Sequence, residues 1–397
     1  TSGSSKTGSA ADTWINKSLL ELVSRYKKLF KINLNIYDEN YHSIFEHLYK
    51  ETNFTDLYIN NTYDPEIDKI DKSLEREFGK LFNIKSYNSS LLFIPNEVLN
   101  NSGSFFKVYT PFWKNALNKL NLRDPLPVPK IKSIYERKIL SIKQSTVDKE
   151  SRIWQKKILS HFKPGEVNAR EILGQISTKL NGYSKNRDFP IQNNTSQLSP
   201  YLARGELSVN EIFFSVKRNK KKVDIDDYIK FTSQLGWREF SYNILYNFPK
   251  LPNTNFISKF NNFPWLKNSN YLSSWKKGAT GYPIVDAGMR ELRATGYMHN
   301  RLRMITASFL IKNLNISWVD GAKWFWDNLF DADIANNSSG WQWVAGCGTD
   351  AAPYFRIFNP TLQSVRFDKD GEYIRKWVPE LRDLPNKFIH SPWELTE

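Results

Sequence analysis

Residues 278–318 read GATGYPIVDAGMRELRATGYMHNRLRMITASFLIKNLNISW, and this stretch predicts two successive helices. Pro283 suits a first helical position because its missing N–H costs nothing there, and Gly296 suits the stop. One face of this first helix carries the apolar residues Val285, Met289 and Leu292. The second helix opens on the polar and basic residues 299–303 and then runs apolar on nearly every side, so it should be deeply buried. A polar cluster at the start of a buried helix directs charges and N–H groups into the interior, which indicates a site.

Two further motifs follow, WFWDNLFDADIANNSSGWQW at residues 324–343 and GTDAAPYFRIFNP at residues 348–360. In the first motif, Asp331 and Asp333 have the spacing of two metal-binding carboxylates, but no third ligand lies nearby in the sequence. An ion pair or a hydrogen bond to a ribose is therefore the better interpretation. The five histidines show no metal-ligand spacing and Cys347 is the only cysteine, so we expect no metal site and no disulfide.

The chain is basic: 56 Lys and Arg residues against 41 Asp and Glu give a formal net charge of +15 and a pI near 9.5. This balance favours a polyanionic partner such as nucleic acid. No apolar run has the length of a membrane span and no signal peptide is recognisable, so we expect a soluble, cytoplasmic protein. A chain of 397 residues can hold two domains, each with a sizeable core.

The N-terminal part alternates helical and strand patterns after a small, polar lead-in at residues 1–12, which we expect to be flexible. Such alternation predicts a parallel sheet with helices outside it. The clearest helix opens at Asp64 and Pro65 and ends at Gly79. Further helices are predicted around residues 19–23 and 44–49, and strands at residues 32–36, 57–59 and 91–94.

Three alternating prolines mark a linker, because proline joins neither a helix interior nor a sheet: Pro125, Pro127 and Pro129. We therefore predict an α/β domain at residues 1–124, a linker at residues 125–163 and an all-helical domain at residues 164–397. An amphipathic helix is predicted near the start of the helical domain from the apolar residues Ile172, Ile176 and Leu180.

Five motifs, TGYPIVDAGMREL, GYMHNRLRM, DADIANN, GWQW and RIFNP, follow one another in the order and spacing of the DNA photolyase/cryptochrome family. The chain resembles this family most clearly over residues 278–360 and more weakly over nearly its whole length. In detail it is most similar to the bacterial class I enzymes that repair cyclobutane pyrimidine dimers. The resemblance implies an α/β antenna-type domain followed by a larger all-α FAD-binding domain. It also implies non-covalent FAD as cofactor, damaged DNA as partner, a carbon–carbon lyase activity and a monomeric state.

The segment YTPFWKNAL, which starts at residue 109, also resembles the antenna domain of this family. The family's usual first strand, with its early arginine-rich motif, and the unit after it are absent, so we expect a truncated parallel sheet. An antenna pigment such as a folate or a deazaflavin normally needs that part. We therefore expect the protein to carry FAD without a second pigment.

The same resemblance assigns residues to the FAD site. Asp331 would pair with Arg303 beside the flavin ring, Asp333 would face the isoalloxazine edge, and Asn337 would lie at the nitrogen that takes up a proton on reduction. An asparagine at that position is typical of photolyases, whereas plant and insect cryptochromes carry other residues. The segment TSQLS at residues 195–199 would grip the pyrophosphate, although its hydroxyls taken alone favour a helix N-cap. The full expected set is Tyr183, Thr195, Ser196, Gln197, Leu198, Ser199, Phe231, Gln234, Arg238, Asn300, Arg303, Asp331, Ala332, Asp333 and Asn337.

Three tryptophans correspond to the electron-transfer chain of the family. In that chain Trp341 would lie nearest the flavin, Trp318 would be intermediate and Trp265 would lie at the surface. Each of them, taken alone, is more often a core residue. Together with Asn337 they form the expected catalytic set.

A lesion would be extruded from the duplex and held between Trp237 and Trp343, as an aromatic clamp for two bases. Basic and polar side chains on the rim would contact the DNA backbone without reading sequence. The expected lesion- and DNA-binding set is Arg187, Gln234, Trp237, Asn300, Arg301, Met304, Trp343 and Gln363, with Arg238 also at the rim.

Two positions depart from the class I pattern: Gln234 stands where a glutamate is usual, and Phe231 replaces a frequent tryptophan. Glutamine is common at the first position in the related (6-4) photolyases, which keeps that lesion as an alternative. Those enzymes, however, use a histidine pair where this chain has Asn300 and Met304. A cryptochrome-like photoreceptor is the second alternative, and a structural relative without flavin is the third.

Overall fold

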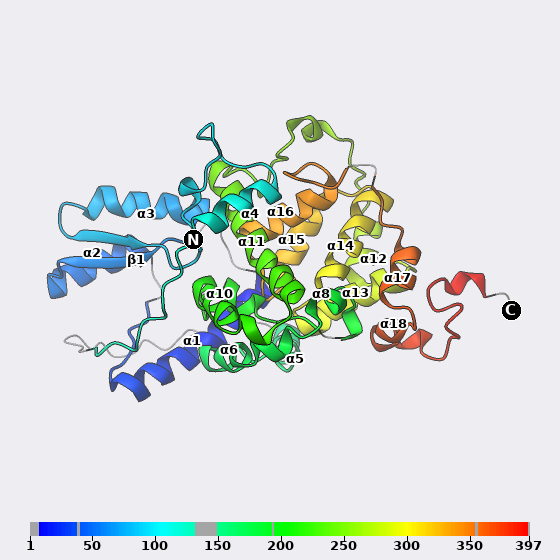
Figure 1. Cartoon of the computed structure of the whole chain (residues 1–397), viewed down its shortest axis with the longest axis horizontal. Helices are drawn as coiled ribbons and strands as arrows, with labels where there is room; N and C mark the ends of the chain where they lie inside the picture. The colour runs from blue at the N-terminus through cyan, green and yellow to red at the C-terminus, as the bar shows by residue number, and fades with distance from the viewer. Residues whose placement is uncertain (1–7, 38–39, 132–148, 193, 354–355, 396–397) are drawn as a thin grey trace.

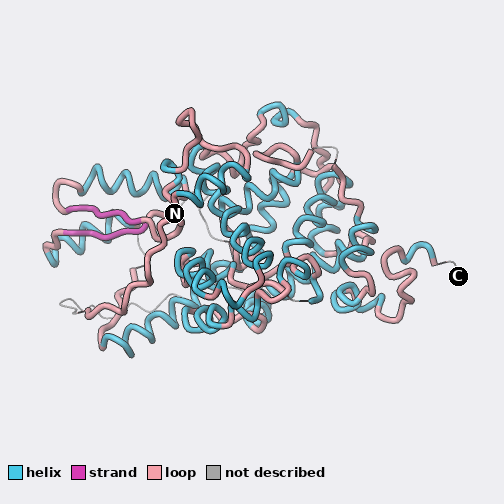
Figure 2. The backbone as a smooth tube through the Cα atoms, in the orientation of Figure 1, coloured by secondary structure: helices cyan, strands magenta, loops and turns pink. Residues whose placement is uncertain are grey.

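The chain folds into a small α/β unit and a much larger helical unit, which Figure 1 shows side by side. A computed structural model describes residues 8–37, 40–131, 149–192, 194–353 and 356–395. Strands occur only in the small unit within these ranges, as Figure 2 shows, so the expected α/β domain with a small parallel sheet and the larger all-α domain are both confirmed.

The α/β unit is a two-stranded parallel sheet with helices packed on it, with β1 at Asp56–Asn60 and β2 at Asn83–Tyr87. Between the strands runs α3 (Pro65–Phe78), which begins as the sequence predicts because the Asp64 side chain accepts the Glu66 N–H. The expected strand at residues 57–59 is confirmed as part of β1. The small core of this unit contains Leu74, Phe78 and Phe82, with α2 (Tyr41–Thr52) packed against it.

Two of the three predicted strands do not form. Residues 32–36 have no strand conformation, and residues 91–94 form a loop, while β2 was not predicted. In the second loop, the N–H groups of Leu92 and Phe93 donate to the Glu239 carboxylate at 2.8 and 3.2 Å instead of to a neighbouring strand. The apolar residues of this segment are buried against a helix, which is why their pattern resembled that of a strand.

The helical elements of the rest of the chain are numbered in sequence order. Those before the family motifs are α1 (Ser9–Phe30), α4 (Tyr109–Asn118), α5 (Lys149–Leu159), α6 (Glu166–Gly174), α7 (Ile176–Lys179), α8 (Tyr183–Asn186), α9 (Ser199–Ala203), α10 (Val209–Arg218) and α11 (Ile225–Asn247). Helix α12 (Ser269–Lys277) also precedes these motifs. Within residues 278–360 lie α13 (Pro283–Thr295), α14 (Asn300–Ser308), α15 (Trp318–Asn328) and α16 (Ile334–Ala345), and the chain continues with α17 (Pro360–Phe367) and α18 (Glu372–Trp377). A π-helical turn at Phe309–Asn313 continues α14, and short 3-10 turns lie at Pro95–Glu97, Pro190–Gln192, Lys220–Lys222, Ser258–Asn262, Pro379–Leu381 and Pro392–Glu394.

The local signals at residues 278–318 determine the two helices that the sequence predicts there. Pro283 is the first residue of α13, and Gly296 ends it with a φ of 70°, a left-handed conformation that favours glycine. The predicted helix through Ile172 and Leu180 is instead two short helices, α6 and α7, with the break at Gln175. The domain boundaries at residues 124 and 163 stay predictions, and residues 132–148 of the linker lie outside the described residues.

The expected flexible lead-in is wrong where the structure describes it, because α1 begins at Ser9 and enters the helical core. The Ser9 N–H donates to the Asp327 carboxylate at 2.9 Å. Trp14 is fully buried, its Nε1–H donates to Glu206 at 3.0 Å, and its ring packs edge-on against Tyr201 and Phe330. The small residues that resembled a flexible tail serve close packing, since the start of α1 lies against α15.

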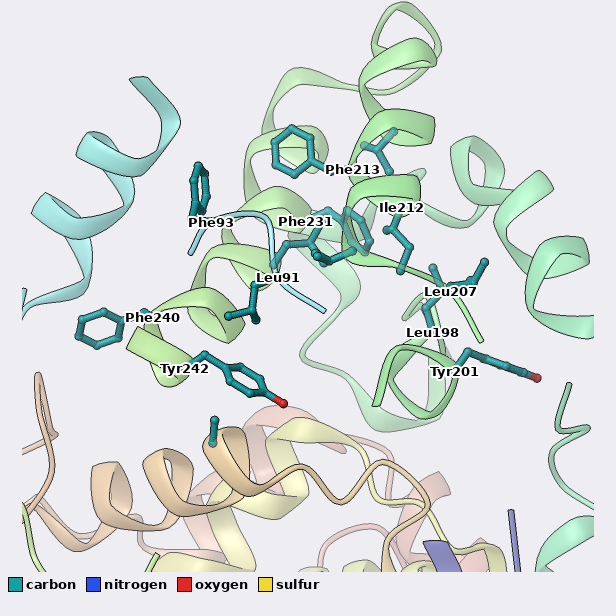
Figure 3. Close-up of a cluster of buried hydrophobic side chains, with 14 of the residues drawn as sticks. Leu91, Phe93, Leu198, Tyr201, Leu207, Ile212, Phe213, Phe231, Phe240 and Tyr242 are labelled. Atoms are coloured by element: carbon teal, nitrogen blue, oxygen red, sulfur yellow. The ribbon is translucent and has the colours of Figure 1, made fainter. Parts of the chain in front are cut away.

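Two hydrophobic cores meet along α11 and α16. The first surrounds α11 and takes in α4, α9 and α10, and Figure 3 shows part of it with Tyr242 at its edge. The second is built from α12 to α16, and α16 packs against both α11 and α15. None of the helices in the described parts of the chain combines the length and the apolar character that crossing a lipid bilayer requires.

The role of α1 in the helical core is testable by substitution. Trp14→Ala should lower the free energy of unfolding by about 3–5 kcal/mol, because it leaves a large cavity in a closed core and removes one of the donors to the buried Glu206. Urea denaturation measures the change. Tyr58→Ala, on the exposed face of β1, is the control and should change stability by at most about 0.5 kcal/mol. Equal effects of the two substitutions would show that α1 is not part of the core.

Candidate functional site

A cavity of about 390 Å³ lies between α11, α14, α15 and α16. Its wall brings together residues from three separate sequence motifs that are up to about a hundred positions apart. The expected site residues that line it are Gln234, Trp237, Asn300, Arg303, Met304, Asp331, Ala332, Asp333, Asn337, Trp341 and Trp343. The cavity therefore collects about half of the predicted cofactor and lesion residues in one place.

The expected pairing of Arg303 with Asp331 is present. The Nη2 of Arg303 donates to Oδ2 of Asp331 at 2.9 Å, and Ser199 donates to the same oxygen at 2.6 Å. The Nε of Arg303 donates to the Met298 carbonyl at 2.8 Å, which fixes the guanidinium at the start of α14. Burial opposes the charge, but the Asp331 carboxylate outweighs it and raises the pKa of Arg303 above its ordinary value. The cavity wall thus holds an oriented ion pair.

Three polar atoms of the cavity wall are buried without a hydrogen-bond partner among the described residues. They are Oδ1 of Asp331, Oγ of Ser339 and Nε1 of Trp341. Buried polar groups in native proteins are almost always paired, and leaving one unpaired is costly. One acceptor, one hydroxyl and one indole donor around a single cavity indicate a polar ligand that completes them, and this donor set fits a cofactor such as FAD.

The loop that joins α15 to α16 is held in part by two residues that the sequence did not single out, Tyr242 and Arg204. Asp333 caps α16 by accepting the Asn336 N–H at 2.8 Å, and its other oxygen accepts the Tyr242 hydroxyl. Burial together with the negative charge of Asp333 raises the pKa of Tyr242 well above its ordinary value, so this phenol stays a donor. The Arg204 guanidinium donates to the Ala332 carbonyl. Asp333 lines the cavity as expected, but both of its oxygens are engaged by the protein.

The three tryptophans expected to carry electrons belong to the second core. Trp341 is 3% exposed and packs edge-on against Phe325, with ring centroids 4.9 Å apart. Trp318 is fully buried and donates to the Asn255 side chain at 2.8 Å, while Trp265 packs on the core from its edge. This order of burial is compatible with the expected chain, whose role in electron transfer stays a prediction. A Cβ on Gly321 would come within 2.1 Å of the Trp341 ring, so only glycine admits the indole here.

The TSQLS segment lies beside the cavity. Ser199 connects it to Asp331, the Thr195 hydroxyl bonds to Tyr297, and Gln197 has a φ of 57°. The N-cap interpretation of these hydroxyls is wrong, because Leu198 occupies the cap of α9 and no side chain caps that helix. Among the remaining expected residues, Ser196 accepts the Leu198 N–H, and Tyr183 packs edge-on against Phe231 at 5.6 Å.

A basic rim lies next to α14. Arg301 donates to Asp188 at 2.8 Å and its guanidinium lies 4.3 Å from the Phe367 ring on α17, which also carries Gln363. Arg187 lies 3.7 Å from the Asp188 carboxylate and over the Tyr183 ring. These contacts bring Arg187, Arg301 and Gln363 to one region, as the expected DNA set requires.

Arg238 does not join the cavity wall or the basic rim. It is only 9% exposed and donates to the Ser90 carbonyl at 2.8 Å, beside Glu239. Full burial raises the pKa of Glu239 to about 7, against the opposing influence of Arg238. The pair instead connects α11 to the loop after β2.

His299 is a positioning residue that the sequence did not identify as one. Its Nδ1 accepts the Arg301 N–H at 3.1 Å, and its Nε2–H donates to the Arg187 carbonyl at 2.8 Å. These partners define a neutral imidazole, and burial lowers its pKa to about 4. His299 thereby caps α14 and holds the two arginines of the rim together. Its place directly before a helix of alternating basic and apolar residues was the available signal.

No group of three or more His, Cys, Asp and Glu side chains in the described part of the chain is arranged to hold a metal ion. The cavity chemistry therefore has to be interpreted from the ion pair, the hydroxyl and amide groups and the aromatic rings.

Comparison with known proteins identifies the class to which this fold and cavity belong. Residues 231–397 match the family model of the FAD binding domain of DNA photolyase, and residues 1–130 match that of DNA photolyase. The chain is 40% identical to a deoxyribodipyrimidine photo-lyase of Agrobacterium fabrum, over 98% of this chain and 81% of the relative. The chain belongs to the DNA photolyase/cryptochrome family, and its helical unit is the FAD-binding domain of that family.

Two solved structures share the whole fold. A bacterial class III photolyase from Agrobacterium tumefaciens superposes with a TM-score of 0.92 at 39% identity, covering 100% of this chain and 83% of its own. A cryptochrome from Synechocystis superposes with a TM-score of 0.84 at 30% identity, covering 98% of this chain and 82% of its own. The family prediction is confirmed, whereas the class I assignment stays a prediction beside a class III relative.

The neutral state of His299 predicts a pH dependence. Between pH 6.5, the ordinary pKa, and pH 4, the unfolded chain binds a proton on this residue and the folded protein does not. The stability that His299 contributes is therefore complete above about pH 6.5 and is lost as the pH falls toward 4. His299→Asn keeps a capping acceptor that does not titrate. Urea denaturation across this range should show the wild-type advantage over the variant shrinking as the pH falls.

Burial raises the pKa values of Glu239 and Glu291 to about 7, so these carboxyls change the free energy of unfolding with pH in the opposite direction. Both carboxyls are present in the wild type and in His299→Asn, so the difference in stability between these two proteins cancels their contribution. A difference between wild type and variant that stays constant across the range would contradict a neutral His299.

Proposed function

We propose that this protein is a light-driven repair enzyme that splits cyclobutane pyrimidine dimers in DNA, with FAD as its cofactor. The observation that carries the proposal is that the cavity wall has a charged, polar part and a separate aromatic part. One part of its wall holds the Arg303–Asp331 pair and unpartnered polar atoms, and another part holds two half-buried indoles, Trp237 and Trp343. A cavity that served a cofactor alone would have no need of two half-buried indoles in its wall.

When bound and reduced, FAD supplies light absorption and a transferable electron that returns after the dimer has split. The residues of this chain orient it. The Arg303–Asp331 pair presents a fixed dipole in a half-buried site, and the Asn337 amide is oriented because its Nδ2 donates to the Ala322 carbonyl at 3.0 Å. Such groups stabilise charge without having to reorganise during the reaction.

The lesion pocket would be formed by the same cavity. Flipping a dimer out of the stack costs less than flipping paired bases, because the lesion already weakens its pairing. Trp237 and Trp343 offer apolar faces to the two rings of the dimer. Asn300 and Met304, which contact each other at 3.8 Å, line the same cavity from α14. Gln234 stands on α11 one turn before Trp237, with its Nε2 donating weakly to the Lys230 carbonyl at 3.3 Å.

The backbone of the DNA would lie along the basic rim. Arg187, Arg301 and Gln363 provide donors for phosphate oxygens, and the net charge of +15 attracts the duplex as a whole. Arg187 and Arg301 both lie close to Asp188, so they are held in place before DNA arrives.

The (6-4) photolyase alternative is disfavoured by the cavity wall, which contains no histidine among the described residues. Asn300 and Met304 occupy the places where those enzymes use a histidine pair, and both nitrogens of His299 are engaged by backbone groups. The cryptochrome alternative is disfavoured because a signalling protein has no need of the Trp237–Trp343 pair. We therefore propose the cyclobutane dimer as the lesion, and the protein can belong to either class I or class III of the photolyases.

The test is repair of an oligothymidine that carries a cyclobutane dimer, in light and in the dark, together with a duplex that carries a (6-4) photoproduct. Loss of the dimer only in light supports the proposal. Light-driven reversal of the (6-4) photoproduct, or no repair of either lesion by the FAD-loaded protein, would overturn it.

Gln234→Glu tests the role of Gln234 in the same assay. A glutamate accepts charge-assisted hydrogen bonds from the N–H edge of the dimer, which are roughly twice as strong as neutral ones. We expect dimer repair per absorbed photon to stay level or rise by up to about tenfold, since one such bond is worth about 1.5 kcal/mol. The (6-4) activity should be absent in both forms. A fall in dimer repair would contradict the acceptor role of residue 234 toward the lesion.

Trp341→Phe tests the proposed electron-transfer chain. The substitution keeps an aromatic ring in a packed site, so FAD should stay bound, while phenylalanine is much harder to oxidise than indole. Light-driven reduction of the bound, oxidised FAD should slow by at least about a hundredfold, a barrier increase of about 2.7 kcal/mol, measured by transient absorption. Repair that starts from chemically reduced FAD should persist. Photoreduction at the wild-type rate would exclude Trp341 from the chain.

A further inference from the structure

One face of the Trp237 indole is already covered by another aromatic ring. Tyr109, the first residue of α4, stacks on it with ring centroids 3.8 Å apart and planes within 8° of parallel. Trp237 itself is half-buried and lines the cavity. The indole can therefore offer only its opposite face to anything bound in the cavity.

Tyr109 is fixed independently of Trp237. Its hydroxyl donates to the Ser233 carbonyl at 2.9 Å and lies 2.8 Å from the Ser233 hydroxyl, one turn before Trp237 on α11. Its backbone N–H donates to the Asp350 carboxylate at 3.1 Å. Burial raises the pKa of this phenol to about 12, so it remains a donor at all physiological pH values. Three separate bonds thus hold the ring at one height along α11.

Asp350 connects this stack to a second part of the cavity wall. It follows Thr349, which lines the cavity, and it has a φ of 47°, in the left-handed region that aspartate enters more readily than most non-glycine residues. The contact joins α4, from the predicted N-terminal domain, to the segment that follows α16, and α16 is the helix that carries Trp343. Tyr109 is therefore braced against α11, which bears Trp237, and against the segment that follows α16, the helix of Trp343.

We propose that Tyr109 is a positioning residue that holds Trp237 as a one-sided stacking platform for an extruded base. This inference rests on the proposed function, since the base is the ligand of that platform. An indole without this backing ring could turn about its side-chain bonds into the space that Tyr109 vacates. A base would then have to order it on binding, and affinity for the lesion would fall. Contacts to the DNA backbone would be unaffected, because Arg187 and Arg301 lie on other elements.

Phe112 provides a matched control on the same helix. Like Tyr109 it is buried, being 1% exposed where Tyr109 is 9% exposed, and it packs on Phe240 with ring centroids 5.3 Å apart. It has no ring contact with Trp237 among the described aromatic pairs. Phe112→Leu therefore removes an aromatic ring from the same interface without uncovering the indole.

The experiment compares Tyr109→Leu, Tyr109→Phe and Phe112→Leu in the FAD-loaded, full-length chain. The first readout is the ratio of affinities for a duplex with a thymine dimer and for the same duplex undamaged. Tyr109→Leu should reduce this ratio by about three- to tenfold, the factor expected of an aromatic pair. Tyr109→Phe, which keeps the stack, should retain the ratio within about twofold, and Phe112→Leu should lower thermal stability while leaving the ratio unchanged.

The second readout does not depend on DNA. In protein labelled with fluorotryptophan, the Trp237 resonance is assigned by its loss in Trp237→Phe. It should be a single narrow line in wild type and in Tyr109→Phe, and it should broaden or split in Tyr109→Leu. An unchanged Trp237 line, or equal ratios in Tyr109→Leu and Phe112→Leu, would overturn the inference.

The two readouts separate failure of the inference from failure of the proposed function. Absence of any lesion preference in wild type counts against the function, and the fluorine spectra still decide whether Tyr109 positions Trp237. If Tyr109→Leu does not fold, Tyr109→Met takes its place, because methionine fills irregular space without offering a ring to stack.

Discussion

The ion pair between Arg303 and Asp331 is the interaction on which the site depends. Placing two charges in a half-buried cavity wall is favourable only when each also has further hydrogen bonds. Here the Met298 carbonyl accepts from Arg303 and the Ser199 hydroxyl donates to Asp331. The pair therefore joins three segments of the helical unit: the start of α14, the loop before α16 and the start of α9. One oxygen of Asp331 is left for a ligand, so the same contact that holds the fold together also faces the cavity.

Helix α11 connects the site to the rest of the chain. Its buried Glu239 accepts the backbone N–H groups of the loop after β2, and its Arg238 donates into the same loop. On its other face Trp237 lines the cavity and Tyr242 donates to Asp333. The small α/β unit is thus anchored to the helix that carries the proposed lesion platform. This explains why residues expected at the DNA or the cofactor, such as Arg238, serve to hold the two units together.

Burial shifts the ionisation of several groups around the site, and His299 acts here in its neutral form. His299 is neutral because burial and two backbone partners leave no room for a second proton, and it arranges Arg187 and Arg301 without touching the cavity. Glu239 and Glu291 are buried carboxyls with pKa values of about 7 that accept backbone and phenol donors. The neutral His299 thus positions two charged arginines without adding a charge of its own.

Local signals in the sequence were sufficient wherever a structure depends on its own few residues. Asp64 and Pro65 begin α3, Pro283 and Gly296 bound α13, and the motifs of residues 278–360 predicted both the family and the Arg303–Asp331 pair. Tertiary structure alone decided which segments pair and which rings stack. Residues 91–94 were misjudged because their N–H groups bond to Glu239, nearly 150 positions away. The same holds for Trp14 beside Glu206 and for Tyr109 on Trp237. In each case the partner is remote in sequence, and hydrophobic periodicity reports only that a residue is buried, not what it is buried against.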